Sequence, residues 1–237
     1  MMSSCGLKIQ NVQFRFTKQS PDFFKDLSVA FEAGKIHFVR GPNGAGKSTL
    51  FRLVQGKIDT SEVASGTISV GEKQYQFRPG SVPHVDEIKM VQQKFDLMLA
   101  DQLSFAHNLQ LANMSEYPRL SPLPEHQPLP AFVNRFGINM QTPVYLLSGG
   151  QRQILSILMA LQKPARVLLL DEPTAALDDK NSKMVMDFLF ELIGTLGLTI
   201  LIICHDKELV DTYAPEGYFE FSINPGSGQR LISLKQK

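Results

Sequence analysis

The sequence has few cysteines, almost no net charge and no long apolar run. Its 2 cysteines in 237 residues, Cys5 and Cys204, show neither a disulfide framework nor metal-ligand spacing, which favours a reducing compartment. Lys and Arg number 24 against 23 Asp and Glu, so no overall field draws the chain to nucleic acid or anionic lipid. The apolar run at 198–204 is far shorter than the ~20 residues of a spanning helix, and no secretory signal is recognisable. We therefore expect a soluble, cytoplasmic protein.

The overall composition is that of a folded globular chain. Hydrophobic residues make up 43% and charged residues 20%, which argues against a disordered or fibrous class. A chain of this length buries a core without help from disulfides or metals. No internal repeat is found, so one large domain or two small ones are expected.

Hydrophobic patterns predict an α/β protein. Alternation predicts a strand at 7–16, and shorter strands are expected at 27–31, 36–39, 67–70 and 74–77. The runs 167–170 and 198–204 are almost wholly apolar, as is typical of central parallel strands with helices on both faces. Helical patterns lie at 48–55, 96–114, 151–162 and 181–196, and a β-hairpin is expected around 224–228. Prolines predict a stiff connector at 118–130.

A phosphate-binding pattern follows the strand expected at 36–39. The matching residues of G-x-x-x-x-G-K-[ST] are Gly41, Pro42, Asn43, Gly44, Ala45, Gly46, Lys47, Ser48 and, one further, Thr49. The glycines let backbone N–H groups surround an anion, and the next helix adds the positive end of its dipole. Lys47 is expected to reach the β- and γ-phosphates of a nucleotide, and the Ser48 hydroxyl is expected to bind Mg²⁺.

A pair of carboxylates ends the apolar run at 167–170. Asp171 and Glu172 would lie at the carboxyl edge of the sheet, where open α/β folds bind ligands. Asp171 is expected to hold the Mg²⁺ shell, and Glu172 to align and polarise the attacking water. Taken alone, the pair also fits a solvated acidic turn, but the phosphate loop upstream favours the catalytic interpretation.

A second anion nest follows Leu147. It consists of the Ser148 hydroxyl and the backbone of Gly149, Gly150 and Gln151 at the start of a predicted helix. With this string the sequence resembles the ATP-binding cassette ATPases, the nucleotide-binding subunits of ABC transporters, over nearly the whole chain and in the family's order of motifs.

The resemblance implies a fold and a domain division. The fold is a P-loop NTPase core with a mostly parallel sheet, an N-terminal antiparallel β subdomain and an inserted α-helical subdomain. We expect a single domain over 1–237, with the nucleotide-binding core and β subdomain at about 1–93 and 163–237 and the helical subdomain at about 94–162.

The resemblance also assigns residues outside these motifs. Phe16 falls where the family stacks an aromatic ring on adenine, although a core aromatic at a strand end is the alternative. Gln93 matches the family's glutamine that contacts Mg²⁺ and the attacking water. The neighbouring Gln92 is the alternative match, one residue earlier. Asp178 matches the loop that crosses the dimer interface. His205 matches the histidine that contacts the γ-phosphate.

Two stretches depart from the family pattern. Residues 154–161 replace a stretch that often contains Ala-Arg-Ala, which should alter helix packing rather than hydrolysis. The proline-rich segment 118–130 lies where the family docks its membrane subunit, so the identity of the partner does not transfer.

The implied function is ATP hydrolysis by a pair of cassettes. Each ATP is held between Lys47 of one subunit and residues 148–151 of the other, in a homodimer or with a paired cassette, while Glu172, His205 and Lys47 serve catalysis. A separate transmembrane permease is implied, so the chain would be peripheral on the cytoplasmic face of the membrane. The sequence that follows residue 151 resembles that of cassette subunits from importers that use a separate substrate-binding protein.

Other functions remain as alternatives. The first is a non-transport cassette ATPase in repair, translation or cofactor assembly, although no coiled coil, tandem cassette or basic stripe is found and no nucleic acid is expected. An ordinary P-loop kinase or GTPase does not explain residues 147–151 or 176–178. A scaffold without activity would have lost residues that are present here, such as Lys47 and Glu172.

Overall fold

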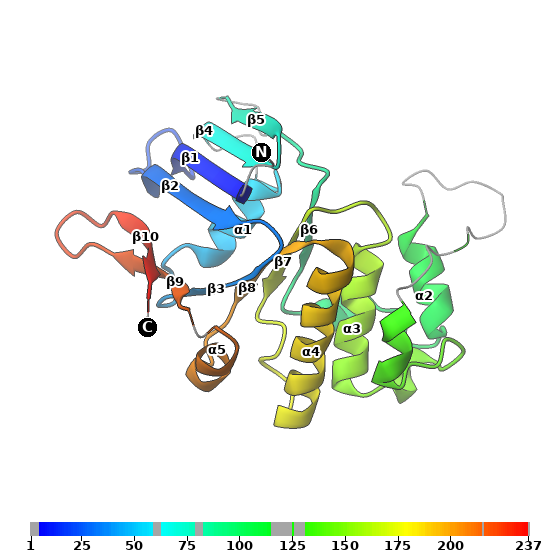
Figure 1. Ribbon diagram of the computed structural model, residues 1–237. Helices are drawn as coiled ribbons and strands as arrows, with labels where there is room; N and C mark the ends of the chain where they lie inside the picture. The colour runs from blue at the N-terminus through cyan, green and yellow to red at the C-terminus, as the bar shows by residue number, and fades with distance from the viewer. Residues whose placement is uncertain are drawn as a thin grey trace.

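An antiparallel sheet and a mostly parallel sheet pack together, with a group of helices on one side (Figure 1). The computed structural model describes residues 5–58, 63–78, 83–114, 125, 131–214 and 216–236. The antiparallel sheet has the strand order β2-β1-β4-β5. Its strands are β1 (Cys5–Arg15), β2 (Phe24–Glu32), β4 (Val63–Val70) and β5 (Lys73–Phe77).

The second sheet has the strand order β10-β9-β3-β8-β7-β6. Neighbours from β9 to β6 run parallel, and β10 closes the hairpin antiparallel to β9. The strands are β3 (Ile36–Arg40), β6 (Ile88–Val91), β7 (Val167–Asp171), β8 (Thr199–Ile203), β9 (Tyr218–Ile223) and β10 (Arg230–Lys235). The mostly parallel sheet, the antiparallel N-terminal sheet and the terminal hairpin confirm the predicted fold class.

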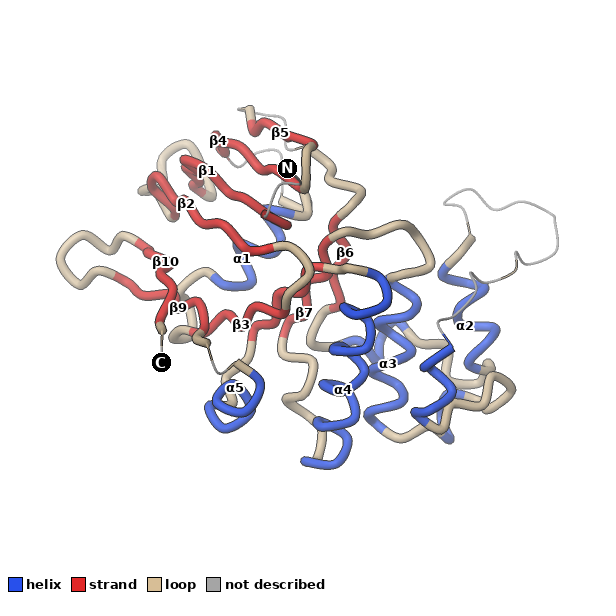
Figure 2. Tube along the Cα trace, in the orientation of Figure 1, coloured by secondary structure: helices blue, strands red, loops and turns tan. Residues whose placement is uncertain are grey.

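Helices cover the parallel sheet on both faces. Figure 2 shows α2, α3 and α4 side by side, and α3 packs against both α2 and α4. The helices are α1 (Lys47–Val54), α2 (Phe105–Ala112), α3 (Gly149–Ala160), α4 (Asp179–Leu196) and α5 (Lys207–Tyr213), with 3₁₀ turns at Phe95–Met98, Ala131–Phe136 and Val144–Leu146.

The apolar runs in β7 and β8 are explained by two cores. Leu168 and Leu170 point into the core formed with α3 and α4, whereas Val167 and Leu169 point into the core shared with α1 and the antiparallel sheet. Because successive side chains of a strand alternate between faces, a strand between two cores must be apolar at every position.

The helix predicted at 96–114 is wrong over its first half. Only the 3₁₀ turn Phe95–Met98 and α2 form there, because the fully buried Asn108 binds the loop between them. Its side chain accepts from Ala100 N at 2.8 Å and donates to the carbonyls of Ala100 and Ser104 at 3.1 and 3.0 Å. Ser104 then caps α2 by accepting from His107 N. Side-chain bonds to backbone compete with helix formation here.

The proline-rich segment and the lack of a long apolar run are the remaining features of the sequence. The prolines of segment 118–130 lie outside the described residues. Within the described part of the chain, no helix is long and apolar enough to cross a membrane.

Glu87 links the strand β5 of the antiparallel sheet to the start of β6. Its carboxylate binds Lys73 Nζ and accepts from Tyr75 Oη at 2.5 Å, both on β5, immediately before β6 begins. These hydrogen bonds, from Lys73 first, lower the pKa of Glu87 to about 2. Burial and the neighbouring Glu87 raise the pKa of Tyr75 to about 12.

Burial on α4 predicts a matched pair of stability effects. Leu189 is 0% exposed and Leu196 is 49% exposed. We expect Leu189→Ala to lower the free energy of unfolding by about 2–5 kcal/mol, since it removes buried carbon and leaves a cavity. Leu196→Ala should cost less than about 1 kcal/mol. Urea unfolding measures both, and equal losses would contradict the packing described.

A second prediction concerns acid stability. Because the folded-state pKa of Glu87 is lowered, its contribution is fully present above its ordinary pKa of 4.5 and is lost as the pH falls toward about 2. Glu87→Gln should therefore be less stable than the parent at pH 6, and the difference should shrink across that window. The exposed Glu72 provides the control substitution Glu72→Gln, for which urea unfolding should follow the parent profile.

Candidate functional site

The loop between β3 and α1 has a backbone that requires glycine. Gly41, Gly44 and Gly46 have φ values of 144°, 77° and 106°. A Cβ on Gly41 would lie 2.5 Å from the Phe221 carbonyl oxygen, and a Cβ on Gly46 would lie 2.9 Å from the Phe23 ring. Gly46 is the N-cap of α1 and no side chain caps this helix, so its first N–H groups are available to an anion.

Lys47 is held inside this loop. Its Nζ donates to the carbonyl oxygens of Gly41 at 2.8 Å and Pro42 at 3.0 Å, and the residue is only 6% exposed. Burial lowers the pKa of Lys47, while the carboxylates of Glu172 and Asp171 act in the opposite direction. The ammonium group therefore lies at the phosphate loop, near both acidic side chains.

A hollow of about 320 Å³ opens over the loop, and we call it the phosphate-loop pocket. Its lining residues are Phe16, Phe23, Asn43, Gly44, Gly46, Lys47, Ser48, Thr49, Glu172 and His205. Phe16 is 37% exposed and meets Phe14 and Phe23 edge-on, with ring centroids 5.0 and 4.9 Å apart. Its ring is thus at the pocket, not in the core.

Glu172 lies at the centre of three strand ends. It follows β7 directly, and its Oε2 accepts from Gln93 Nε2 at 2.9 Å, while His205 Nε2 lies 3.2 Å from its Oε1. Gln93 comes after β6 and His205 after β8, the two neighbours of β7 in the sheet. Of the adjacent glutamines it is Gln93 whose amide meets the carboxylate. Glu172 also has φ 52°, a conformation that non-glycine residues rarely adopt and that is typical of strained functional sites.

Asp171 ends β7 beside the start of α1. Burial raises the pKa of Asp171, and a hydrogen bond from the Ser48 side chain opposes that rise. Among the residues that the structure describes, no group of three or more His, Cys, Asp and Glu side chains is placed to hold a metal ion. A metal here would therefore need hydroxyl, amide or substrate oxygens beside Asp171.

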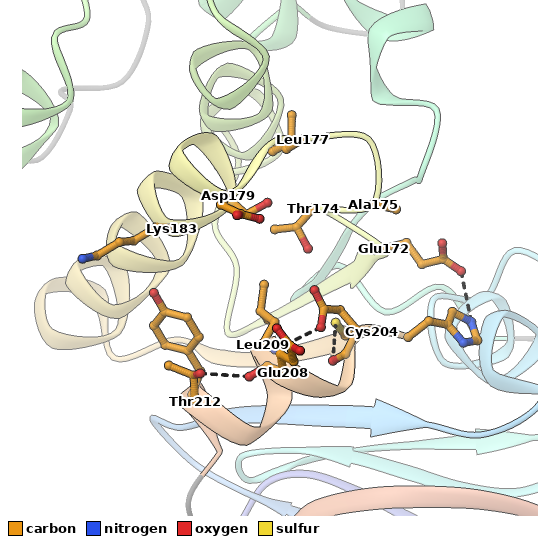
Figure 3. A pocket seen from close by; sticks show the side chains of 14 residues that line it. Glu172, Thr174, Ala175, Leu177, Asp179, Lys183, Cys204, Glu208, Leu209 and Thr212 are labelled. Atoms are coloured by element: carbon orange, nitrogen blue, oxygen red, sulfur yellow. Dashed lines mark hydrogen bonds and ion pairs between the residues drawn. The ribbon is translucent and has the colours of Figure 1, made fainter.

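A second cleft lies on the other side of Glu172 and His205. Figure 3 shows its wall formed by the start of α4, with Asp179 and Lys183, and by α5, with Glu208 and Thr212. The cleft has a volume of about 490 Å³. Because Glu172 and His205 line both hollows, they form the partition between them.

The anion nest lies apart from the phosphate-loop pocket, whose lining contains none of residues 148–151. Ser148 caps α3: its Oγ accepts from Gln151 N at 3.2 Å, and its N–H donates to Gln151 Oε1 at 3.1 Å. A Cβ on Gly149 would lie 2.8 Å from Leu177. The nest is therefore packed against the segment that leads into α4.

Asp178 is the N-cap of α4. Its Oδ1 accepts from the backbone N and the side-chain Nδ2 of Asn181 at 2.8 and 2.9 Å. Asn181 in turn contacts the anion nest, because its Oδ1 accepts from Ser148 Oγ at 3.0 Å and Gly150 N at 3.2 Å. Asn181 therefore connects the anion nest with Asp178.

Sequence reasoning missed two residues behind the phosphate loop. The Arg230 guanidinium carbon lies 3.6 Å from the centre of the Phe23 ring, and Arg230 Nε donates to Gly44 O at 3.4 Å. Phe23 in turn lies against Gly46. No local pattern marks Arg230, since its contact with the loop spans 186 residues of sequence.

Comparison with known proteins identifies the family. The family model described as "ABC transporter" matches residues 24–175. The chain belongs to the ABC transporter family. The cassette fold and the order of the motifs confirm the resemblance drawn from the sequence.

The similar curated proteins are named as import ATP-binding subunits. The methionine import ATP-binding protein MetN of Protochlamydia amoebophila is 34% identical over 190 residues, which cover 78% of this chain and 54% of that protein. The phosphonates import ATP-binding protein PhnC 1 of Rhodopseudomonas palustris is 31% identical over 217 residues, which cover 88% of this chain and 76% of that protein. The chain thus spans about half of the first relative.

Solved structures show the same fold along the chain. The structure of cbiO1 from Clostridium perfringens, described as part of the ABC transporter complex cbiONQ, has a TM-score of 0.76 and 26% identity and covers 99% of this chain and 89% of its own. MJ1267, an ATP-binding cassette in its ADP conformation, has a TM-score of 0.75 at 19% identity, covers 99% of this chain and 92% of its own, and supports the fold alone.

The phosphate loop predicts a sharp difference between two glycines. Gly46→Ala forces a side chain into a left-handed position against the Phe23 ring, so the loop must move and nucleotide affinity should fall about tenfold or more. Gly194 on α4 has no atom within 4 Å of an added Cβ, so Gly194→Ala should leave affinity unchanged. Titration with a fluorescent ATP analogue measures both, and equal affinities would contradict this account of the loop.

Proposed function

We propose that this chain is an ATP-hydrolysing subunit that dimerises around ATP and powers a separate membrane permease. The observation that carries the proposal is the placement of Glu172 between Gln93 and His205 at the edge of the phosphate-loop pocket. A carboxylate in that place can take a proton from a water that attacks a phosphate held by the loop.

The pocket offers separate contacts for the adenine and for the phosphates of ATP. The half-exposed Phe16 ring is available for stacking on adenine. Backbone N–H groups of residues 43–49 surround the phosphates, and Lys47, released from its two carbonyl partners, reaches the β- and γ-phosphates.

The donor set beside α1 fits Mg²⁺. Ser48 already hydrogen-bonds Asp171, and Gln93 lies against the neighbouring Glu172, so hydroxyl, carboxylate and amide oxygens meet there. Hard oxygen ligands together with substrate phosphates are what Mg²⁺ prefers. We assign the ion to Ser48, Gln93 and Asp171; when bound, it supplies positive charge to the phosphate oxygens.

Hydrolysis follows from the three side chains around Glu172. Glu172 accepts a proton from water as its oxygen attacks the γ-phosphorus, and the bond to the bridging oxygen breaks to give ADP and phosphate. His205 contacts the γ-phosphate and holds Glu172 in place. Gln93 fixes the second carboxylate oxygen.

A second subunit completes the site. Residues 148–151 offer a hydroxyl and N–H groups but do not line the phosphate-loop pocket of their own chain. We assign them to the γ-phosphate bound by a second copy or a paired cassette, with Asp178 crossing the interface. The γ-phosphate then closes the dimer, and its loss releases the dimer.

The permease contact is assigned to the surface beside Gln93. Leu97 and Met98 are 84% and 60% exposed in the turn that follows Gln93, an apolar surface on the path to Glu172. With this contact, we propose that the chain is peripheral on the cytoplasmic face of the membrane. The names of the relatives favour import. We further propose a nucleotide-binding core with the β subdomain at about 1–93 and 163–237 and a helical subdomain at about 94–162.

Two substitutions separate binding from hydrolysis. Glu172→Gln should lower the ATP hydrolysis rate about 10²- to 10⁴-fold, because the amide cannot accept the proton, while ATP binding persists and dimers accumulate. Lys47→Ala should weaken ATP binding itself. Steady-state hydrolysis, ATP titration and size-exclusion chromatography distinguish the two.

The matched control for Glu172→Gln is Glu216→Gln. The Glu216 side chain is 88% exposed and lies outside the pocket lining, so this variant should hydrolyse ATP at the parent rate. A Glu172→Gln protein with full activity would overturn the assignment of the base.

A further inference from the structure

The anion nest at the start of α3 is filled by a side chain of its own subunit. The Oδ1 of Asn181 accepts from Ser148 Oγ at 3.0 Å and from Gly150 N at 3.2 Å, which are donors that a phosphate oxygen would use. Gly150 makes this approach possible, since a Cβ there would lie 2.8 Å from the Asn181 oxygen.

The same side chain holds Asp178. Asn181 Nδ2 donates to Asp178 Oδ1 at 2.9 Å, so one amide bridges the nest and the residue assigned to the dimer interface. The backbone N–H of Asn181 binds the same carboxylate oxygen at 2.8 Å and would keep Asp178 as the cap of α4 if the side chain left. Asn181 is partly exposed, so its amide can find water when displaced.

We propose that Asn181 is a positioning residue that occupies the anion nest in the free subunit and yields it to the γ-phosphate of a second copy. This inference rests on the proposed function. An amide oxygen carries a partial charge where a phosphate oxygen carries close to a full one, and hydrogen bonds to charged groups are stronger, so the phosphate displaces the amide. When the phosphate displaces the Asn181 side chain, the hydrogen bond from Asn181 Nδ2 to Asp178 Oδ1 breaks as the dimer closes.

The proposal predicts opposite effects of two substitutions. Asn181→Ala leaves the nest donors open to water, so dimerisation should need about threefold to tenfold less ATP, as expected when about two neutral hydrogen bonds no longer compete. Asn181→Asp places a fixed negative charge in the nest, so dimerisation should need at least about tenfold more ATP. A residue that merely supports the fold would weaken dimerisation in both variants.

The experiment uses the full chain in the Glu172→Gln background. Analytical ultracentrifugation with Mg²⁺ and increasing ATP gives the midpoint of dimerisation for the parent, Asn181→Ala and Asn181→Asp. Asn134→Ala, at an exposed asparagine of the Ala131–Phe136 turn, is the matched control and should keep the parent midpoint. ATP affinity of the monomer should not change, because Asn181 does not line the phosphate-loop pocket.

The outcomes separate this inference from the proposed function. Midpoints shifted in opposite directions at constant monomer affinity support the role of Asn181. An unchanged or higher midpoint for Asn181→Ala overturns that role while the dimer model stands. If the Glu172→Gln chain forms no dimer at saturating ATP, the proposed function fails, and the inference fails with it.

Discussion

The site depends on the parallel pairing of β6, β7 and β8. Within this part of the sheet Val91 pairs with Leu170 and Asp171 pairs with Ile203, so the three strands end at the same edge. Gln93, Glu172 and His205 follow those ends, and the hydrogen bonds around the Glu172 carboxylate are possible only in this register. Because a shift by one residue would turn every side chain to the opposite face, the two apolar cores also fix the geometry of the site.

Much of this arrangement is predictable from local sequence. The glycines of residues 41–46 predict a loop whose backbone folds around an anion, and in the structure Gly41, Gly44 and Gly46 have the positive φ values that glycine adopts readily. The uninterrupted apolar runs of β7 and β8 likewise predict burial on both faces. The strand order is not local, since β3 lies between β8 and β9, far away in sequence. The strand order is therefore predictable from the family resemblance and not from periodicity.

The errors and omissions have a common physical origin. The helix expected from 96 fails because the buried amide of Asn108 satisfies the backbone of Ala100 and Ser104, which no hydrophobic pattern reveals. Arg230 and Phe23 support the phosphate loop through contacts between distant segments. In each case a polar or aromatic side chain acquires its partners only after folding, so its identity alone carries little information.

In the proposed dimer, closing around ATP exchanges hydrogen bonds that the free subunit already makes. Lys47 binds loop carbonyls, and Ser148 and Gly150 bind Asn181, so these donors from both halves of the proposed nucleotide site already have partners in the free subunit. When a phosphate oxygen replaces such a partner, each donor exchanges one hydrogen bond for another. The free energy gained is therefore only the difference between the two hydrogen-bonded states. That difference, not the full strength of each contact, sets the affinity of the dimer. In the proposed dimer, such a balance lets the loss of one phosphate open the interface that its presence closes.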